Sequence, residues 1–328
     1  MITRQPDTDL SLIPLSRRNI MTSTQTTAPH LAEVPPPDVA EGRTVADISD
    51  LDLGDRPGIR PRMGVAVGLA TRLGVAAASV AVGVGAAVAV GAVGGLTASV
   101  ALTVGVVGAA ALTAVAANWS TCGMSVAGVV AAPKQSDRPG DGSALARLGA
   151  HLAGSLLTAL PVGAGLGLLG MAANQVVGPV PVAPVLAGWS LLALMYGLHE
   201  TGLVRMPTPM RRQQLPRHLR RVGRPMRVSF YFGTLIGPGF MIFIRSSAYY
   251  LLFLGTVALA NPALGAALFA AVSVGRCGPS VMAIVHQHRG GTMGDFLLKC
   301  MSADRLVQLA AGSGLLALAG FGAAALAV

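Results

Sequence analysis

The chain has 328 residues, of which 52% are apolar and only 12% are charged. A soluble globular domain carries about 25% charged residues, so this composition excludes an ordinary soluble protein and places the chain in a lipid bilayer. Nine of the fourteen acidic residues fall between Asp7 and Asp55, which leaves the chain after residue 62 strongly basic. In a membrane protein such an excess of positive charge reflects topology, and no nucleic-acid partner is predicted.

Residues 1–62 mix Thr, Ser, Pro and Asp without a sustained apolar period, and they include the run Pro35-Pro36-Pro37. Such a segment cannot bury enough apolar surface to offset the entropy of ordering it, so we expect a disordered cytoplasmic N-terminal tail. The pair Arg17-Arg18 is not followed by the apolar run that an export signal needs, and no cleaved signal peptide is predicted. Met21 is an alternative start.

Seven apolar stretches follow the tail. A bilayer core of about 30 Å needs roughly 20 apolar residues per helix, and the stretches lie near residues 63–90, 96–118, 146–170, 180–199, 229–259, 262–285 and 305–328. Lipid tolerates only helices or closed barrels, and these stretches show no alternating strand pattern. The predicted fold class is therefore an all-α polytopic membrane bundle. Residues 63–133 also have room for three tight spans, which would give eight.

The arginines test this count. Eight arginines and no acidic residue lie between Glu200 and Ser229, and an excess of Lys and Arg in short loops marks the cytoplasmic side. With seven spans, Arg56, Arg60 and Arg62 at the end of the tail face that same side, as do the segments around Lys134 and Arg289. Eight spans would place the N-terminal and central arginines on opposite sides. We therefore predict a bacterial inner-membrane protein with its N-terminus in the cytoplasm.

A short segment of the chain occurs twice. Cys122–Val130 (CGMSVAGVV) matches Cys277–Val285 (CGPSVMAIV), with Cys, Gly, Ser and Val in register, although the chain has only three cysteines. We interpret residues 63–170 and 229–328 as two three-span membrane repeats, joined by residues 171–228, which hold the fourth span and the Arg-rich loop. Sites in repeat-built membrane proteins lie at the interface of the halves. Cys122 and Cys277 would then occupy equivalent positions and face one another.

The residues around both cysteines, Trp119-Ser120-Thr121-Cys122-Gly123 and Gly275-Arg276-Cys277-Gly278-Pro279, resemble the CcdA/DsbD group of transmembrane thiol–disulfide carriers. That family passes reducing equivalents across the membrane between thioredoxin-like proteins. The resemblance implies that Cys122 and Cys277 are the catalytic redox pair and that the partner is a thioredoxin-like protein. No cofactor is predicted. The alternative is that both cysteines only pack helices, since free Cys is commonly buried.

A second hypothesis rests on the fifth span. This span contains the helix-breaking sequence Gly237-Pro238-Gly239 and, further on, Arg245. Ionisable residues inside spans are costly and mark functional sites by default, and broken helices hold solutes in transporters. The chain would then be a secondary transporter or exporter that binds a small anionic solute at Arg245. An arginine that reaches the interface along its own stem explains the same residue without a substrate.

The remaining polar residues give weaker signals. We expect His151 to be hydrogen-bonded within the bundle and Glu200, at the end of the fourth span, to be solvated. His286, His288 and Cys300 lack the spacing of a zinc site, so no metal site is predicted. Motifs for nucleotide-driven or hydrolytic chemistry are missing from the sequence. A third hypothesis is a non-catalytic membrane partner, in which neither the cysteines nor Arg245 matter beyond stability.

Overall fold

The computed structural model describes residues 67–116, 119, 121–131, 142–207, 224–239 and 246–327. Within these residues every secondary-structure element is a helix: α2 (Leu69–Ala92), α3 (Ala98–Ala116), α4 (Thr121–Val130), α5 (Ala144–Val177), α6 (Val182–Thr201), α8 (Pro225–Ile236), α9 (Ala248–Leu259), α10 (Pro262–Arg276), α11 (Gly278–His288) and α12 (Met293–Ala325). Most of the Arg-rich loop, the Lys134 segment and the N-terminal tail lie outside the described residues.

Six of the helical segments are long and apolar enough to cross a membrane, with α10 and α11 counted together, and α9 is a shorter apolar helix. These counts refer to the described residues. They confirm the predicted all-α multi-pass membrane bundle. A turn separates the first two spans, because α2 ends at Ala92 and Gly94 has a φ of +84°.

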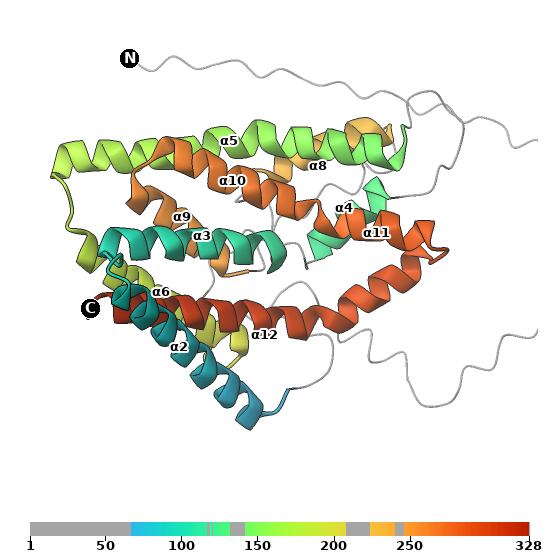
Figure 1. Ribbon diagram of the computed structural model, residues 1–328. Helices are drawn as coiled ribbons and strands as arrows, with labels where there is room; N and C mark the ends of the chain where they lie inside the picture. Colours follow the sequence, from blue (N-terminus) through green and yellow to red (C-terminus); the bar gives the residue numbers. More distant parts are fainter. Residues whose placement is uncertain are drawn as a thin grey trace, which may run out of the picture. The chain divides into compact units, whose positions relative to one another are not determined.

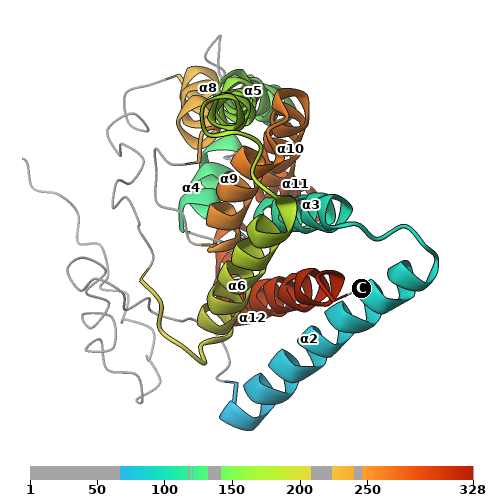
Figure 2. The same cartoon turned by 90° about the vertical axis from the view of Figure 1, so that its left-hand side faces the viewer.

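Four helices lie side by side in the order α5, α10, α3 and α12, from top to bottom in Figure 1, and each contacts the next. Helices α2 and α6 pack against α12, whereas α8 and α9 pack against α5. Figure 2 shows α2 and α6 beside α12 from a second direction. The core between these helices is apolar, and its largest buried side chains include Trp189, Tyr249 and Phe269.

Glycines let several of these helices approach closely. In the contact between α2 and α12, a Cβ atom on Gly83 would meet the carbonyl oxygen of Ala317, and one on Gly320 would meet the carbonyl oxygen of Val80. The hydrophobic effect does not drive helices together in a membrane, because the lipid tails are themselves apolar. Close backbone packing is therefore a main source of association energy there. The reciprocal arrangement makes α2 and α12 a tightly joined pair.

The same arrangement recurs elsewhere in the bundle. A Cβ atom on Gly154 of α5 or on Gly233 of α8 would meet a carbonyl oxygen of the other helix. Gly163 of α5 and Gly265 of α10 likewise face each other's carbonyl oxygens. Glycine spacing therefore determines which helices of the bundle pair closely.

The fifth span is broken where the sequence predicts it. Helix α8 ends at Ile236, and α9 begins only at Ala248. Pro238 lacks an N–H group to continue the helix, and Gly239 has a φ of +79°, a conformation that favours glycine. Arg245 lies in the segment between the two half-helices, outside the described residues.

Several helix boundaries differ from the prediction, and α5 extends to Val177 rather than to residue 170. Helix α12 begins at Met293 rather than near residue 305, because Thr292 caps its polar first turns. The Thr292 hydroxyl accepts a hydrogen bond from the Asp295 N–H at 3.1 Å and donates one to the Asp295 carboxylate at 2.8 Å. The sixth predicted span consists of two helices, α10 and α11, with Cys277 at the junction.

Candidate functional site

The two helices that carry the repeated segment are in contact. Cys122 is the second residue of α4, and Cys277 immediately precedes α11. Helix α4 packs against α11, and Ala127 and Ala131 bury their side chains together with Ala283 of α11. Both cysteines therefore belong to the starts of two short helices that touch, while the side chain of Cys122 lies outside the described residues.

Cys277 is a free thiol that is buried at the junction of α10 and α11. Its Sγ atom lies 3.7 Å from the carbonyl oxygen of Ser273, one turn earlier in α10, as a weak donor. A thiol in this position reaches a partner protein only when the packing around it opens.

Cys300 of α12 lies in the same region, which the sequence pattern does not indicate. It is a second buried free thiol, and its side chain packs in one cluster with those of Ala127 and Ala283. The indole N–H of Trp119 donates to the Cys300 carbonyl oxygen at 2.9 Å. Helices α4, α11 and α12 thus meet around Cys300, and Trp119 packs against this cluster.

Arg276, next to Cys277, reaches the broken fifth span. Its guanidinium group donates to the carbonyl oxygen of Ile236, the last residue of α8, and lies over the Tyr249 ring at 5.3 Å. The Tyr249 hydroxyl in turn donates to the Pro238 carbonyl oxygen at 2.8 Å. A positive charge therefore sits at the C-terminal end of α8, where it stabilises the carbonyl groups that have no helical partner.

Glu200 places a negative charge at the N-terminal end of α9, the second half of the broken span. It is buried near the end of α6, and its Oε1 atom accepts from the N–H of Ser247 at 2.8 Å and from the Ser247 hydroxyl at 2.7 Å. A carboxylate at the N-terminal end of α9 satisfies N–H groups and complements the helix dipole. The expectation that Glu200 is solvated is wrong, because these contacts draw it into the bundle.

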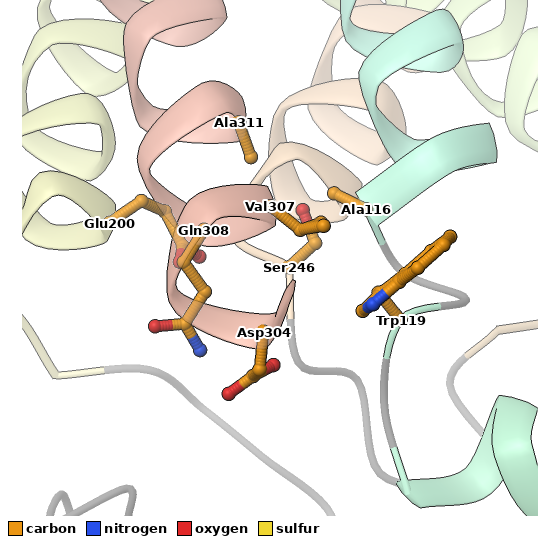
Figure 3. A pocket seen from close by; sticks show the side chains of 8 residues that line it. All are labelled: Ala116, Trp119, Glu200, Ser246, Asp304, Val307, Gln308 and Ala311. Carbon is orange, nitrogen blue, oxygen red and sulfur yellow. The ribbon is translucent and has the colours of Figure 1, made fainter. Parts of the chain in front are cut away.

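A small pocket with both polar and apolar walls lies beside this contact (Figure 3). Its polar lining comes from the side chains of Glu200, Ser246, Asp304 and Gln308, and Trp119 stands at its side. Asp304 and Gln308 occupy one face of α12, four residues apart, and both are buried. The pocket joins the ends of α3 and α6, the start of α9 and the first half of α12.

The structure places two of the predicted site residues at the starts of neighbouring helices. Cys122 and Cys277 lie at the starts of two touching helices, whereas Arg245 lies outside the described residues. His151 is buried, with Nδ1 at 3.3 Å from the carbonyl oxygen of Ser229, as expected. No group of three His, Cys, Asp or Glu residues suited to a metal ion occurs in the described part of the chain.

Comparisons with known proteins give a partial match. The chain is 31% identical over 134 residues to the methylamine utilization protein MauF of Methylobacillus flagellatus, which is 39% of this chain and 44% of the relative. It is 28% identical over 129 residues to MauF of Methylophilus methylotrophus, with 39% and 44% covered. For MauF of Paracoccus denitrificans the match is 28% over 180 residues, or 52% of this chain and 61% of the relative.

The chain thus spans about half the length of the curated relatives it matches. No protein-family model matches it, and no solved structure matches it. The chain is similar to proteins named for methylamine utilization. Its resemblance to the thiol–disulfide carriers stays a prediction.

Proposed function

We propose that this integral membrane protein serves methylamine utilization as an accessory protein and that it does so by thiol–disulfide exchange through Cys122 and Cys277. The similarity to the MauF proteins supports the first part. The observation that carries the second part is the contact between α4 and α11, since each helix has one cysteine of the repeated segment at its start. The setting proposed is the bacterial inner membrane, with the N-terminus in the cytoplasm and the two three-span repeats facing each other.

The exchange is balanced with two cysteines and two dithiol partners. A reduced thioredoxin-like protein attacks the Cys122–Cys277 disulfide through its thiolate, passes through a mixed disulfide, and leaves as its own disulfide. The membrane protein then holds two thiols, having gained two electrons and two protons. It passes both to the disulfide of a second thioredoxin-like protein, which regenerates the Cys122–Cys277 bond.

Formation of that bond sets a geometric condition. Two cysteines can be bridged only if their Cα atoms come within about 7 Å. Because Cys277 is buried at a helix junction, exchange requires α4 and α11 to move so that one sulfur is exposed to the partner at a time.

The test is a maleimide–polyethylene glycol gel shift on protein in native membranes, in a Cys300→Ser background so that only Cys122 and Cys277 report. We expect both thiols to resist labelling until a reductant is added, and mass spectrometry to find them linked. Labelling of both without reductant, or of neither after reduction, would overturn the redox proposal. The methylamine role is tested separately, by growth of a deletion strain on methylamine with the native gene or the Cys122→Ser gene supplied.

A second candidate function is favoured by the broken fifth span. Arg276 occupies the C-terminal end of α8 and Glu200 the N-terminal end of α9, and the ends of discontinuous helices are where transporters hold solutes and coupling ions. The protein would then be a secondary transporter or exporter of a small solute, with Arg245 in the connecting segment. Solute flux into proteoliposomes that survives Cys122→Ser with Cys277→Ser and is lost in Arg245→Gln would favour this function over thiol exchange.

A further inference from the structure

We infer that the pocket formed by Glu200, Ser246, Asp304 and Gln308, beside Trp119, binds a small ammonium-type cation. This inference uses neither Cys122 nor Cys277, so it can be tested independently of thiol exchange. The pocket residues come from α3, α6 and α12, from Trp119 after α3 and from the segment before α9, and they meet at one place in the bundle (Figure 3).

The first argument is the charge of the lining. Glu200 is 5% exposed and Asp304 is 3% exposed, and both face the pocket together with the carboxamide of Gln308. Burying carboxylates is costly unless they are paired or hydrogen-bonded. Both acids and Gln308 take part in interactions of their own. A carboxylate offers about four acceptor positions, so an engaged acid still accepts from a ligand.

The second argument is independent of the acids. Ser246 is 3% exposed and lines the pocket, and its hydroxyl has no hydrogen-bond partner among the described residues. Buried hydroxyl groups in proteins are nearly always paired, because leaving one unpaired costs about 1–3 kcal/mol. A hydrogen-bonding ligand in the pocket gives Ser246 its partner.

The third argument identifies the ligand class. The pocket is small, with room for a ligand of one or two heavy atoms, and its remaining walls are the side chains of Ala116, Val307 and Ala311. The indole of Trp119 is held by its bond to Cys300, and an aromatic ring beside carboxylates attracts an organic cation. A primary ammonium has three N–H donors for the oxygen lining and an apolar group for the alanines.

The experiment measures binding of radiolabelled methylammonium to the purified full-length protein in lipid nanodiscs. We expect saturable binding that weakens about tenfold or more in Asp304→Asn, since a hydrogen bond to a charged group is lost. Binding should also weaken severalfold in Ser246→Ala, which removes only one oxygen atom. The matched control is Asp295→Asn, an exposed acid on the same helix, and it should bind like the native protein.

Competition decides the ligand class. Unlabelled ammonium should displace the probe, whereas potassium and sodium chloride at the same concentration should not, and tetramethylammonium should be too large to enter. Non-saturable binding, equal binding in Asp304→Asn, or equal displacement by potassium would each overturn the inference. Size-exclusion profiles that match the native protein show that a variant is folded, and Ser246→Ala serves as the second variant if Asp304→Asn fails that control.

Discussion

The Oε1 atom of Glu200 accepts two hydrogen bonds from one residue, the N–H and the hydroxyl of Ser247, at 2.8 and 2.7 Å. This contact joins the end of α6 to the start of α9, and it does so with a buried charge at a helix N-terminus. Removal of the carboxylate would leave a buried N–H group without its acceptor.

We therefore expect Glu200→Ala to destabilise the protein by about 2–4 kcal/mol, because two hydrogen bonds to a charged group and a favourable helix-dipole interaction are lost. Glu200→Gln keeps an acceptor oxygen of nearly the same shape and should cost less than half as much. The measurement is the free energy of unfolding in detergent for both variants. Equal stability of the two variants would show that the Ser247 contact contributes little.

The glycine contacts give a prediction with a matched control on the same helix. A Cβ atom on Gly163 would meet the carbonyl oxygen of Gly265, whereas nothing lies within 4 Å of the corresponding position on Gly165. Gly163→Ala should destabilise by about 1–3 kcal/mol through overpacking. Gly165→Ala should be neutral or stabilise by up to about 1 kcal/mol, since alanine favours the helix. Thermal unfolding curves of both variants test this, and a cost at Gly165 as large as at Gly163 would contradict it.

The hydroxyl of Tyr249 offers a test of the break in the fifth span. Tyr249 is fully buried, and its hydroxyl donates to the Pro238 carbonyl oxygen while its ring packs against Phe269. Tyr249→Phe keeps the ring and removes one hydrogen bond, so we expect a loss of about 1 kcal/mol in unfolding free energy. Tyr231→Phe, which removes the hydroxyl of an exposed tyrosine on α8, is the control. Proteolysis of the 237–247 segment should also become faster in Tyr249→Phe alone.

The topology makes a prediction about the two sides of the membrane. The proposed topology of seven spans with the basic loops inside predicts that the C-terminal end of α12 lies outside the cytoplasm. Alkaline phosphatase fused after residue 328 should be active and green fluorescent protein at the same position should be dark. Fusions at residue 207, just after α6, should give the reverse pattern. The same pattern at both positions would require an even number of spans between residue 207 and residue 328.

Hydropathy was sufficient to place most helices, because the apolar runs are long and the breaks carry glycine, proline or asparagine. The start of α12 was missed, since its first turns are polar and are stabilised by a cap that acts locally at Thr292 and Asp295. That omission had a consequence for the site. Asp304 lies within this helix and lines the pocket together with Glu200.

The repeated cysteine segment pointed to α4 and α11, which do meet, but the pattern carried no information about Cys300 or Trp119. Trp119 and Cys300 are 181 residues apart in the sequence, and one hydrogen bond from the indole N–H to the Cys300 carbonyl oxygen joins them. Any backbone carbonyl offers such an acceptor, so no residue type in α12 marks it. The pocket could not be predicted from the sequence either, because its four polar residues come from three separate parts of the chain.

The glycine contacts also limit how this sequence can change during evolution. At Gly83, Gly154, Gly163, Gly233, Gly265 and Gly320 every replacement adds at least a Cβ atom against a backbone carbonyl of another helix. At Gly68, Gly74, Gly85, Gly149, Gly165 and Gly188 the same atom meets open space. Two classes of glycine therefore occur within α2 and within α5. One class is fixed by the backbone of a neighbouring helix, and the other can be replaced by alanine or serine without a clash.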